Sequence, residues 1–350
     1  ALYRAFSEMV TSIKEEAFSP CIAYTGTQPV EYAAVPLTMY GSGADHLEAY
    51  TSMSALLEHF YAEKNTLTRI RQKSSDLRRI VQTALERDIK KYDLQLTQME
   101  DTKKREKYRI YGELLNTYGY SAKPGDKSLT AVNYYTNEPV TIPLDPTLSA
   151  TENAKKYFDK YGKLKRTYEA LSELTCQVKE EIDHLETIST ALDIALKEED
   201  LVEIKEELTQ SGYIRRKGGS KKAKITSRPF HYLSSDGFHI YVGKNNFQND
   251  ELTFKFATGN DWWFHAKGIP GSHVVVKTEG KELPDRTFEE AGRLAAYYSK
   301  GREQEKVEID YVQKKQVKKP AGAKPGFVVY YTNYSLMIDS DISGIEKISD

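Results

Sequence analysis

Two stretches in the second half of the sequence combine aromatic, imidazole, hydroxyl and ammonium groups that could bind RNA. The first is DWWFHAKGIPGSHVVV (261–276), which contains both tryptophans of the chain. Because side chains alternate along a strand, one ring points inward and the other outward. An outward ring can stack on a nucleobase, which is worth about 1–3 kcal/mol per base. We therefore predict an RNA contact at the pair Trp262 and Trp263.

The loop after the tryptophans, KGIPGS (267–272), has glycines on both sides of an Ile-Pro pair. Such a loop allows backbone N–H groups to converge into an anion-binding concavity. The serine and the histidine that follow can each donate a hydrogen bond there. A tight turn beside a hydrogen-bonded core histidine would explain the same residues without a ligand. The predicted binding residues at this loop are His265, Lys267, Gly271, Ser272 and His273.

The second stretch, QKKQVKKPAGAKPG (313–326), places five lysines beside two prolines and two glycines. Charges on flexible stems suit contacts to phosphate without reading of base sequence. Another basic run, RRKGGSKKAK (215–224), precedes the same region and is typical of a flexible linker. Charge runs often belong simply to solvated faces, which is the alternative interpretation. The predicted phosphate contacts are Lys314, Lys315, Lys318, Lys319, Lys324, Arg215 and Arg216.

Signatures of catalysis are missing from the sequence. It contains no GxxxxGK[ST], no GxGxxG after a strand, no HExxH and no CxxC pair. Cys21 and Cys176 are far apart, which excludes a disulfide framework, favours a reducing compartment and offers no zinc site. His265 and His273 have no further ligand nearby. We therefore expect no catalytic residue, no metal and no cofactor, and a protein that is not an enzyme.

Charge is distributed unevenly along the chain. The formal net charge is −1, yet residues 211–350 hold about 23 Lys and Arg against about 17 Asp and Glu. This asymmetry predicts that only the second half meets a polyanion. With 29% charged and 39% hydrophobic residues, the chain is too polar for one large globule and suits long solvated helices. No run approaches 18 apolar residues, so we expect no membrane insertion and a cytoplasmic location.

Long helical segments dominate the first half. Residues 53–115 contain no proline, and Leu67, Ile70, Leu77, Val81 and Ala84 recur on one side. A second segment keeps apolar residues at steps of three and four from position 161 to 196, which is a strong coiled-coil signal. Ser149 and Glu152 have the spacing of a capping box at its start. Because a Gly/Pro-containing insert separates the two segments, they should pair antiparallel.

The remaining patterns alternate between strand and helix. In residues 225–350 we predict a hairpin with a two-residue type I′ turn at Asp236-Gly237 and a helix after Asn249. Strands WWFHA and HVVVKT come next, then a helix over 285–302 and strands VEIDYV and FVVYY. Residues 1–50 contain a short helix and strands at 21–25 and 31–40, without enough chain for a core of their own.

These patterns predict an α+β protein in which a long antiparallel two-helix coiled coil carries a C-terminal mixed α/β globular module. The expected parts are the tail of a truncated N-terminal domain (1–50), the coiled coil (51–212), a basic linker (213–224) and an RNA-binding module (225–350). The insert at 116–149 lies at the tip of the coil. It serves either to close the helical hairpin or as a contact surface.

Three ordered motifs, DGFHIYVGKNNFQNDELTFKFA, WWFHAKGIPGSHVVV and VKKPAGAKPGFVVY, closely resemble the C-terminal RNA-binding module of the NFACT family. The segments RQKSSDLRR, YGELLNTY and ENAKKYFDKYGKLKR are similar to its paired helices. The resemblance covers nearly the whole chain. It implies that the family's RNA-binding residues correspond here to His265, Gly271, Ser272, His273 and the lysines of VKKPAGAKPG.

The resemblance to this family implies a role in ribosome quality control. Its members bind obstructed large ribosomal subunits, through rRNA and a stalk-base protein, recruit tRNA and promote untemplated alanine tailing of stalled chains. The family's other name, fibronectin-binding protein, implies an alternative: an adhesin that reaches the cell surface by a non-classical route. Most of the family's N-terminal region, which carries much of the tRNA recognition, has no counterpart here. Binding without tailing is therefore the expectation for this chain.

Overall fold

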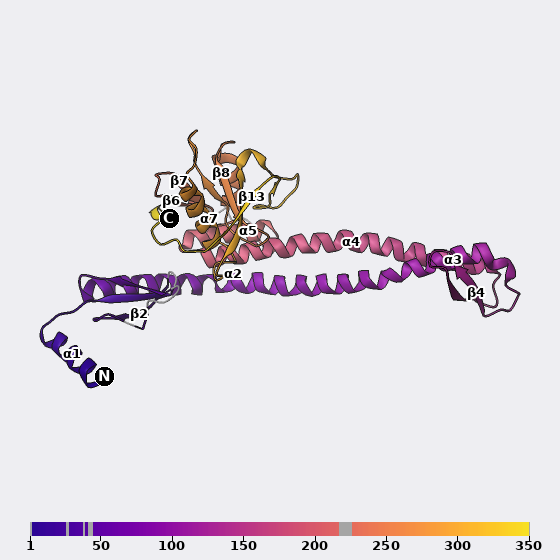
Figure 1. Ribbon diagram of the computed structural model, residues 1–350, viewed down its shortest axis with the longest axis horizontal. Helices are drawn as coiled ribbons and strands as arrows, with labels where there is room; N and C mark the ends of the chain where they lie inside the picture. The colour runs from indigo at the N-terminus through magenta and orange to yellow at the C-terminus, as the bar shows by residue number, and fades with distance from the viewer. Residues whose placement is uncertain (1, 26–27, 38, 41–44, 217–225, 350) are drawn as a thin grey trace. The chain divides into compact units, whose positions relative to one another are not determined.

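The computed structural model describes residues 2–25, 28–37, 39–40, 45–216 and 226–349. The chain divides into two compact units, one formed by Ala1–Ile80 with Ile188–Asp350 and the other by Val81–Thr187. Two long helices, α2 (Met53–Asp101) and α4 (Ala150–Ile194), pass through both units (Figure 1). The predicted fold class is confirmed, since a long helical region is combined with an antiparallel sheet module.

Contacts between the long helices show that they run antiparallel. In the second unit Thr175 of α4 contacts Met99 of α2 at 3.5 Å, whereas Tyr157 of α4 packs on Tyr111, which lies beyond the end of α2, with ring centroids 5.3 Å apart. Residue numbers therefore rise along one side of the pair as they fall along the other, which is the antiparallel arrangement. The predicted apolar seam is buried over most of its length, which confirms the prediction. The side chain of Leu67 is not among those that the structure describes. Its buried members include Ile70, Leu77, Val81, Ala84, Leu171, Val178, Ile182, Leu185 and Leu192.

The sequence predicted one continuous helix over residues 53–115, but the helix is interrupted. A 3-10 turn, η1 (Thr102–Lys104), separates α2 from α3 (Arg105–Tyr118). Thr102 is buried, and its hydroxyl donates to the carbonyl of Met99 at 2.6 Å, which ties the side chain to its own turn. At the start of α4 the predicted capping box is present. Ser149 N donates to Glu152 Oε2 at 2.8 Å, and Glu152 N donates to Ser149 Oγ at 3.3 Å.

The insert between the long helices is a β-hairpin that packs on the helices on either side of it. After η2 (Gly119–Ser121), strands β4 (Ser128–Asn133) and β5 (Glu138–Pro143) pair antiparallel. Leu114 and Ile142 are fully buried there beside Ala154. A hydrophobic cluster shared by α3, the hairpin and α4 fixes the hairpin on the second unit.

The N-terminal part of the first unit forms a small sheet. Its elements are α1 (Leu2–Lys14), β1 (Cys21–Thr25), β2 (Gln28–Ala33) and β3 (Asp45–Ala49), with strand order β2-β1-β3. The strand predicted at 31–40 ends at Ala33, and β3 was not predicted from the sequence. Ile22 and Tyr24 pack on Leu56 and Phe60, so this sheet shares its core with the first turns of α2.

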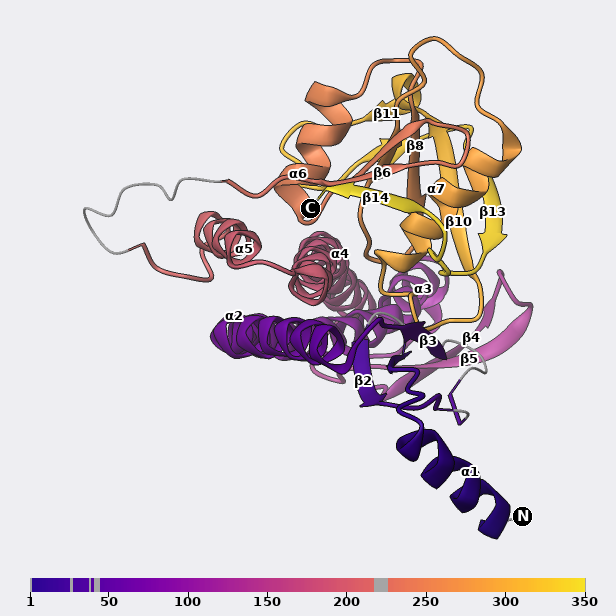
Figure 2. The same cartoon turned by 90° about the vertical axis from the view of Figure 1, so that its left-hand side faces the viewer.

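An antiparallel sheet is the centre of the C-terminal module (Figure 2). It has seven strands, in the order β13-β10-β8-β9-β7-β6-β14. Its strands are β6 (Phe230–Leu233), β7 (His239–Val242), β8 (Trp262–Ala266), β9 (Val274–Val276), β10 (Val307–Gln313), β13 (Tyr334–Ile338) and β14 (Glu346–Ser349). The other elements are α5 (Glu198–Gln210), α6 (Asn246–Glu251), the π-helical turn η3 (Leu252–Phe256), α7 (Asp285–Tyr297), η4 (Lys314–Gln316), β11 (Val317–Lys318) and β12 (Val329–Tyr330).

Both faces of this sheet are covered. On one face α7 packs over Phe264, Val276 and Ile309. On the other, Leu252 of η3 and Val317 of β11 enclose a second cluster. Because both faces are covered, alternating side chains of a central strand enter a core on either side.

Three local expectations in the module need correction. The hairpin β6–β7 closes at Ser234 and Phe238, whose N–H···O bond is 2.8 Å long, so its loop has three residues. Only Gly237 of the predicted turn has a positive φ, of 80°, as in a type I turn followed by a left-handed glycine. The helix expected after Asn249 begins at Asn246, capped by the Asn245 side chain. Helix α7 ends at Tyr297, before the predicted residue 302.

Candidate nucleic-acid interface

The lysine-rich segment 314–326 is held in place by backbone bonds at both ends. Lys314 N donates to the carbonyl of Asp261 at 2.9 Å, and Lys315 N donates to that of Gly259 at 3.1 Å. At the far end Gly326 N donates to Asp250 Oδ1 at 3.1 Å. Charges on an anchored loop are presented in a fixed arrangement, which reduces the entropy lost on binding.

The five lysines of this segment differ in availability. Lys315 and Lys318 are exposed, and neither forms an ion pair with any described residue. Lys319 is paired with Asp250. Lys314 is half-buried, with its Nζ 5.9 Å from the Phe254 ring centre, and Lys324 is half-buried as well. Lys315 and Lys318 are therefore best placed to meet phosphate.

Arg215 and Arg216 are the last described residues before the gap at 217–225. Arg216 pairs with Glu206 of α5, whereas Arg215 is exposed. The remainder of the predicted basic run, residues 217–224, lies outside the described residues. Of the two, Arg215 is the better candidate for a phosphate contact, because Arg216 already has an acidic partner.

The expectation of a free tryptophan ring is corrected by the structure. Trp263 is fully buried in the second cluster, with Tyr330 and His273 rings at 5.1 and 5.0 Å. Trp262 is half-buried and packs edge-on against Phe288 at 4.9 Å. The predicted alternation is correct, but each ring enters a covered face of the sheet. Neither ring offers an open surface for base stacking.

His273 is a hydrogen-bonded core histidine, which was the alternative explanation of this loop without a ligand. It is 1% exposed, and its Nδ1 lies 2.8 Å from Thr253 Oγ1 and 3.2 Å from the carbonyl of Asn249. Burial holds the pKa of His273 well below its ordinary value. Burial also lowers the pKa of half-buried His265 to about 4, although backbone hydrogen bonds with Gly271 and Ala266 oppose that shift. Both imidazoles are therefore neutral at pH 7.

At the KGIPGS loop, where the sequence predicts an anion-binding concavity, the N–H groups of Ser272 and His273 already have partners within the chain. Ser272 N donates to the carbonyl of Tyr298 at 2.9 Å, and its side chain is buried. His273 N donates to Asn249 Oδ1 at 3.0 Å. A Cβ on Gly271 would lie 3.0 Å from that of Ser299, so this glycine permits close packing.

Lys267 follows β8 and lies beside two acidic groups. Its Nζ is 2.6 Å from Glu308 Oε1 and 3.9 Å from Asp310 Oδ1. The hydrogen bond to Glu308 raises the pKa of Lys267, so it stays charged, but the charge is balanced locally. The structure therefore moves the candidate interface away from this loop and onto the lysine-rich segment.

A buried polar network joins α5 to α6, and sequence reasoning missed it. Glu203 accepts from Asn245 Nδ2 and Gln248 Nε2, each at 2.7 Å, and Glu207 accepts from Asn246 Nδ2 at 2.7 Å. All of these side chains are less than a tenth exposed. The available signal was the amide-rich run KNNFQN directly after a strand. Buried amides need partners, and acidic residues on the preceding helix supply them.

One further contact links this network to the lysine-rich segment. A Cβ on Gly326 would lie 2.3 Å from Asn246 Oδ1, and the residue has a φ of 79° that only glycine adopts readily. The segment therefore rests directly on the residue that binds Glu207. Helix α5, the start of α6 and the lysines form one structural unit.

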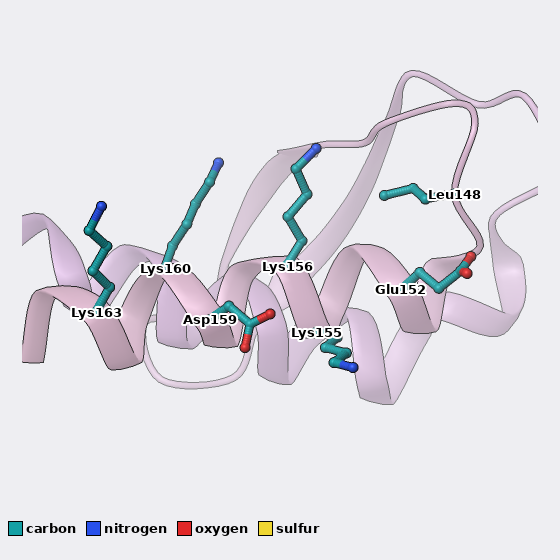
Figure 3. Close-up of a pocket in the computed structure, with 7 residues that line it drawn as sticks. All are labelled: Leu148, Glu152, Lys155, Lys156, Asp159, Lys160 and Lys163. Atoms are coloured by element: carbon teal, nitrogen blue, oxygen red, sulfur yellow. The ribbon is translucent and has the colours of Figure 1, made fainter.

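The second unit carries another basic surface, at the start of α4. A shallow cleft of about 480 Å³ is lined by Leu148, Glu152, Lys155, Lys156, Asp159, Lys160 and Lys163 (Figure 3). Lys156 pairs with Asp145 at 2.9 Å, and the Lys160 Nζ lies 5.4 Å from the ring of Tyr108. Lys156, Lys160 and Lys163 extend from the same side of the helix in Figure 3. This face suits contact with an anionic partner.

The described residues contain neither a metal-binding cluster nor a membrane-spanning helix. No group of three His, Cys, Asp or Glu side chains there is arranged to hold a metal ion. None of the helices in the described ranges is both long and apolar enough to cross a bilayer.

Family models and known proteins that are similar to this chain cover nearly all of its length. Residues 1–227 match the NFACT N-terminal and middle domains, and residues 228–331 match the NFACT protein RNA binding domain. The Rqc2 homolog RqcH of Streptococcus pneumoniae is 39% identical over 332 residues, which cover 94% of this chain and 58% of that protein. The RqcH of Bacillus subtilis is 36% identical, over 99% of this chain and 60% of that protein.

A solved structure is also similar, that of the C-terminal part of the fibronectin/fibrinogen-binding protein from Streptococcus suis. It superimposes with a TM-score of 0.64 at 36% identity, covering 79% of this chain and 99% of that one. The chain thus spans about 60% of the length of the bacterial relatives that it matches.

Proposed function

This chain belongs to the NFACT family, and we propose on that basis that it is an RNA-binding adaptor of ribosome quality control that acts in the cytoplasm. It works by binding rather than by catalysis. The observation that carries the proposal is the position of the anchored lysine-rich segment. It lies within the part matched by the RNA binding domain and presents two exposed lysines that have no acidic partner among the described residues.

Its partners, in this proposal, are obstructed large ribosomal subunits and tRNA. Lys315, Lys318 and Arg215 contact phosphate without reading sequence. The lysine face at the start of α4 meets rRNA and the stalk-base protein. Trp263, Ser272 and His273 shape the module from within and touch no RNA, because they are buried.

The relatives named RqcH suggest a further step, promotion of untemplated alanine tailing of stalled nascent chains. Because this chain spans about 60% of their length, we propose that it retains subunit binding and that tailing needs the rest of such a protein.

Co-sedimentation with purified large subunits tests the proposal. Lys315→Glu with Lys318→Glu should reduce the bound fraction severalfold at 100–150 mM salt, because two phosphate contacts become repulsive. Lys281→Glu with Lys306→Glu changes net charge equally at exposed positions outside the segment and should bind as wild type. Equal binding by the two double variants would refute the assignment.

The name of the similar Streptococcus suis structure supports a second candidate, a surface-associated protein that binds fibronectin. Binding to immobilised fibronectin and to large subunits at matched ionic strength separates the two. A hundredfold preference for fibronectin would favour the adhesin, whereas the adaptor predicts the opposite order.

A further inference from the structure

The two edges of the seven-stranded sheet are unlike each other. Strand β14, at one edge, has the sequence EKIS and carries charged residues. Strand β13, at the other, has the sequence YSLMI, without a charge or a proline (Figure 2). Natural sheets usually protect an open edge with Lys, Pro or a covering element. Instead, Tyr334 and Met337 are each 60% exposed.

A groove runs along this edge, between β13 and helix α7. Its volume is about 520 Å³. Phe288 of α7, Tyr311 of β10 and Leu336 of β13 form its apolar part. Leu336 lies against Gly292 of α7, where a Cβ would approach Leu336 Cδ1 to 3.1 Å. Strand and helix therefore pack closely on the inner side and leave the groove open at the edge.

Acidic residues line the rim. Asp285 and Glu289 lie one turn apart on α7, are exposed, and pair with no described basic residue. Asp339 faces Arg293 at 3.4 Å, so its charge is partly balanced, and Lys306 lies nearby in the lining. Lys306 is exposed and has no acidic partner among the described residues, so two unpaired carboxylates stand against one unpaired ammonium and the balance of charge in the lining is negative. Such a rim repels phosphate and attracts a cationic chain.

We infer that this groove binds an extended basic peptide segment of a partner protein, which adds to the sheet as an eighth strand beside β13. Recognition between an edge strand and a neighbouring helix is an established mode of peptide binding, with backbone bonds for affinity and alternate side chains for specificity. Lysines or arginines on the side of the peptide that faces α7 meet Asp285 and Glu289, and apolar residues between them contact Phe288 and Leu336.

This inference goes beyond the proposed function and is independent of it. The groove lies on the α7 face of the sheet, whereas the lysine-rich segment packs on the opposite face through Val317. One molecule can therefore bind RNA on one face and a peptide at the β13 edge. The charge at the groove also argues against RNA as its occupant.

The test uses the full chain and a fluorescein-labelled peptide in which three lysines alternate with valines. Fluorescence anisotropy measures affinity, and amide hydrogen exchange locates the contact. We expect saturable binding and slower exchange over 334–338. Asp285→Lys with Glu289→Lys should weaken binding about tenfold or more, because attraction at the rim becomes repulsion. Glu282→Lys with Glu303→Lys, at exposed positions outside the groove, is the matched control and should bind as wild type.

Three outcomes would overturn the inference. They are no binding of the lysine peptide, equal binding by the two double variants, and protection of 334–338 by a single-stranded oligouridine. A peptide with glutamates in place of the lysines should not bind. Lys315→Glu with Lys318→Glu should leave peptide binding unchanged, so failure of this site and failure of the RNA site are distinguishable.

Discussion

Glu207 offers a sharp test of the buried network between α5 and α6. Its side chain is 1% exposed, and burial raises its pKa from 4.5 to about 7, with Glu203 and Asp250 adding to the shift and Asn246 opposing it. A carboxyl with a raised folded pKa binds a proton more tightly in the folded state. Its stabilising effect is complete below pH 4.5 and is lost as the pH rises toward about 7.

The substitution Glu207→Gln keeps an oxygen for the 2.7 Å bond from Asn246 and removes the titration. The rise in the pKa of Glu207 from 4.5 to about 7, at about 1.4 kcal/mol per pH unit, sets a ceiling of roughly 3.5 kcal/mol on this effect. Because neighbouring carboxylates relax when one is neutralised, we expect a gain of roughly 1–3 kcal/mol at pH 8 and about a quarter of that at pH 5.

Urea titration followed by tryptophan fluorescence measures this effect, because both tryptophans lie in the C-terminal module and report its unfolding alone. With a slope of about 2 kcal/mol per molar urea, the midpoint at pH 8 should rise by about 1 M. The reasoning is refuted if the variant is no more stable than wild type at pH 8, or if it gains equally at pH 5.

Three further predictions concern single positions. Gly326→Ala should weaken RNA binding severalfold in a filter-binding assay, because a Cβ there meets Asn246 and a positive φ is lost to the anchored segment. Lys244→Ala should lower the free energy of unfolding by about 3–5 kcal/mol, because it removes the Lys244 ammonium that lies 3.2 Å from the buried Asp200 carboxylate. Adding Asp200→Asn to this variant should recover much of that loss in the same urea titration. Ser149→Ala removes the cap of α4 and should cost about 1 kcal/mol, seen as faster amide exchange in the first turn.

Patterns local in sequence predicted the helical part of the fold well. The three–four spacing identified the seam from Leu171 to Leu192, and a four-residue motif located the start of α4. The break at Thr102 was missed because a single threonine gives no periodic signal. Strands β13 and β14 were missed because they are short, and their strand character depends on distant partners, β10 and β6.

The candidate site was predicted only in part, for a related reason. Alternation correctly separated Trp262 from Trp263, but it could not show that η3 and β11 cover the second face of the sheet. Likewise, the acidic side chains of α5 look solvated in sequence. They are buried because amide side chains cover and bind them, and these partners are about forty residues away in the sequence, as Asn245 is from Glu203. Burial set by such distant contacts is not encoded in any local pattern.

The central claim is that exposed lysines of the anchored segment bind RNA through phosphate. The dependence of affinity for large-subunit rRNA on salt, measured between 50 and 300 mM KCl, tests it most directly. Lys315→Glu with Lys318→Glu should reduce the log–log slope by about 1.4–1.8, because each of the two lost phosphate contacts removes about 0.7–0.9. Lys281→Glu with Lys306→Glu should retain the wild-type slope. A slope that is unchanged in the first variant would contradict the claim.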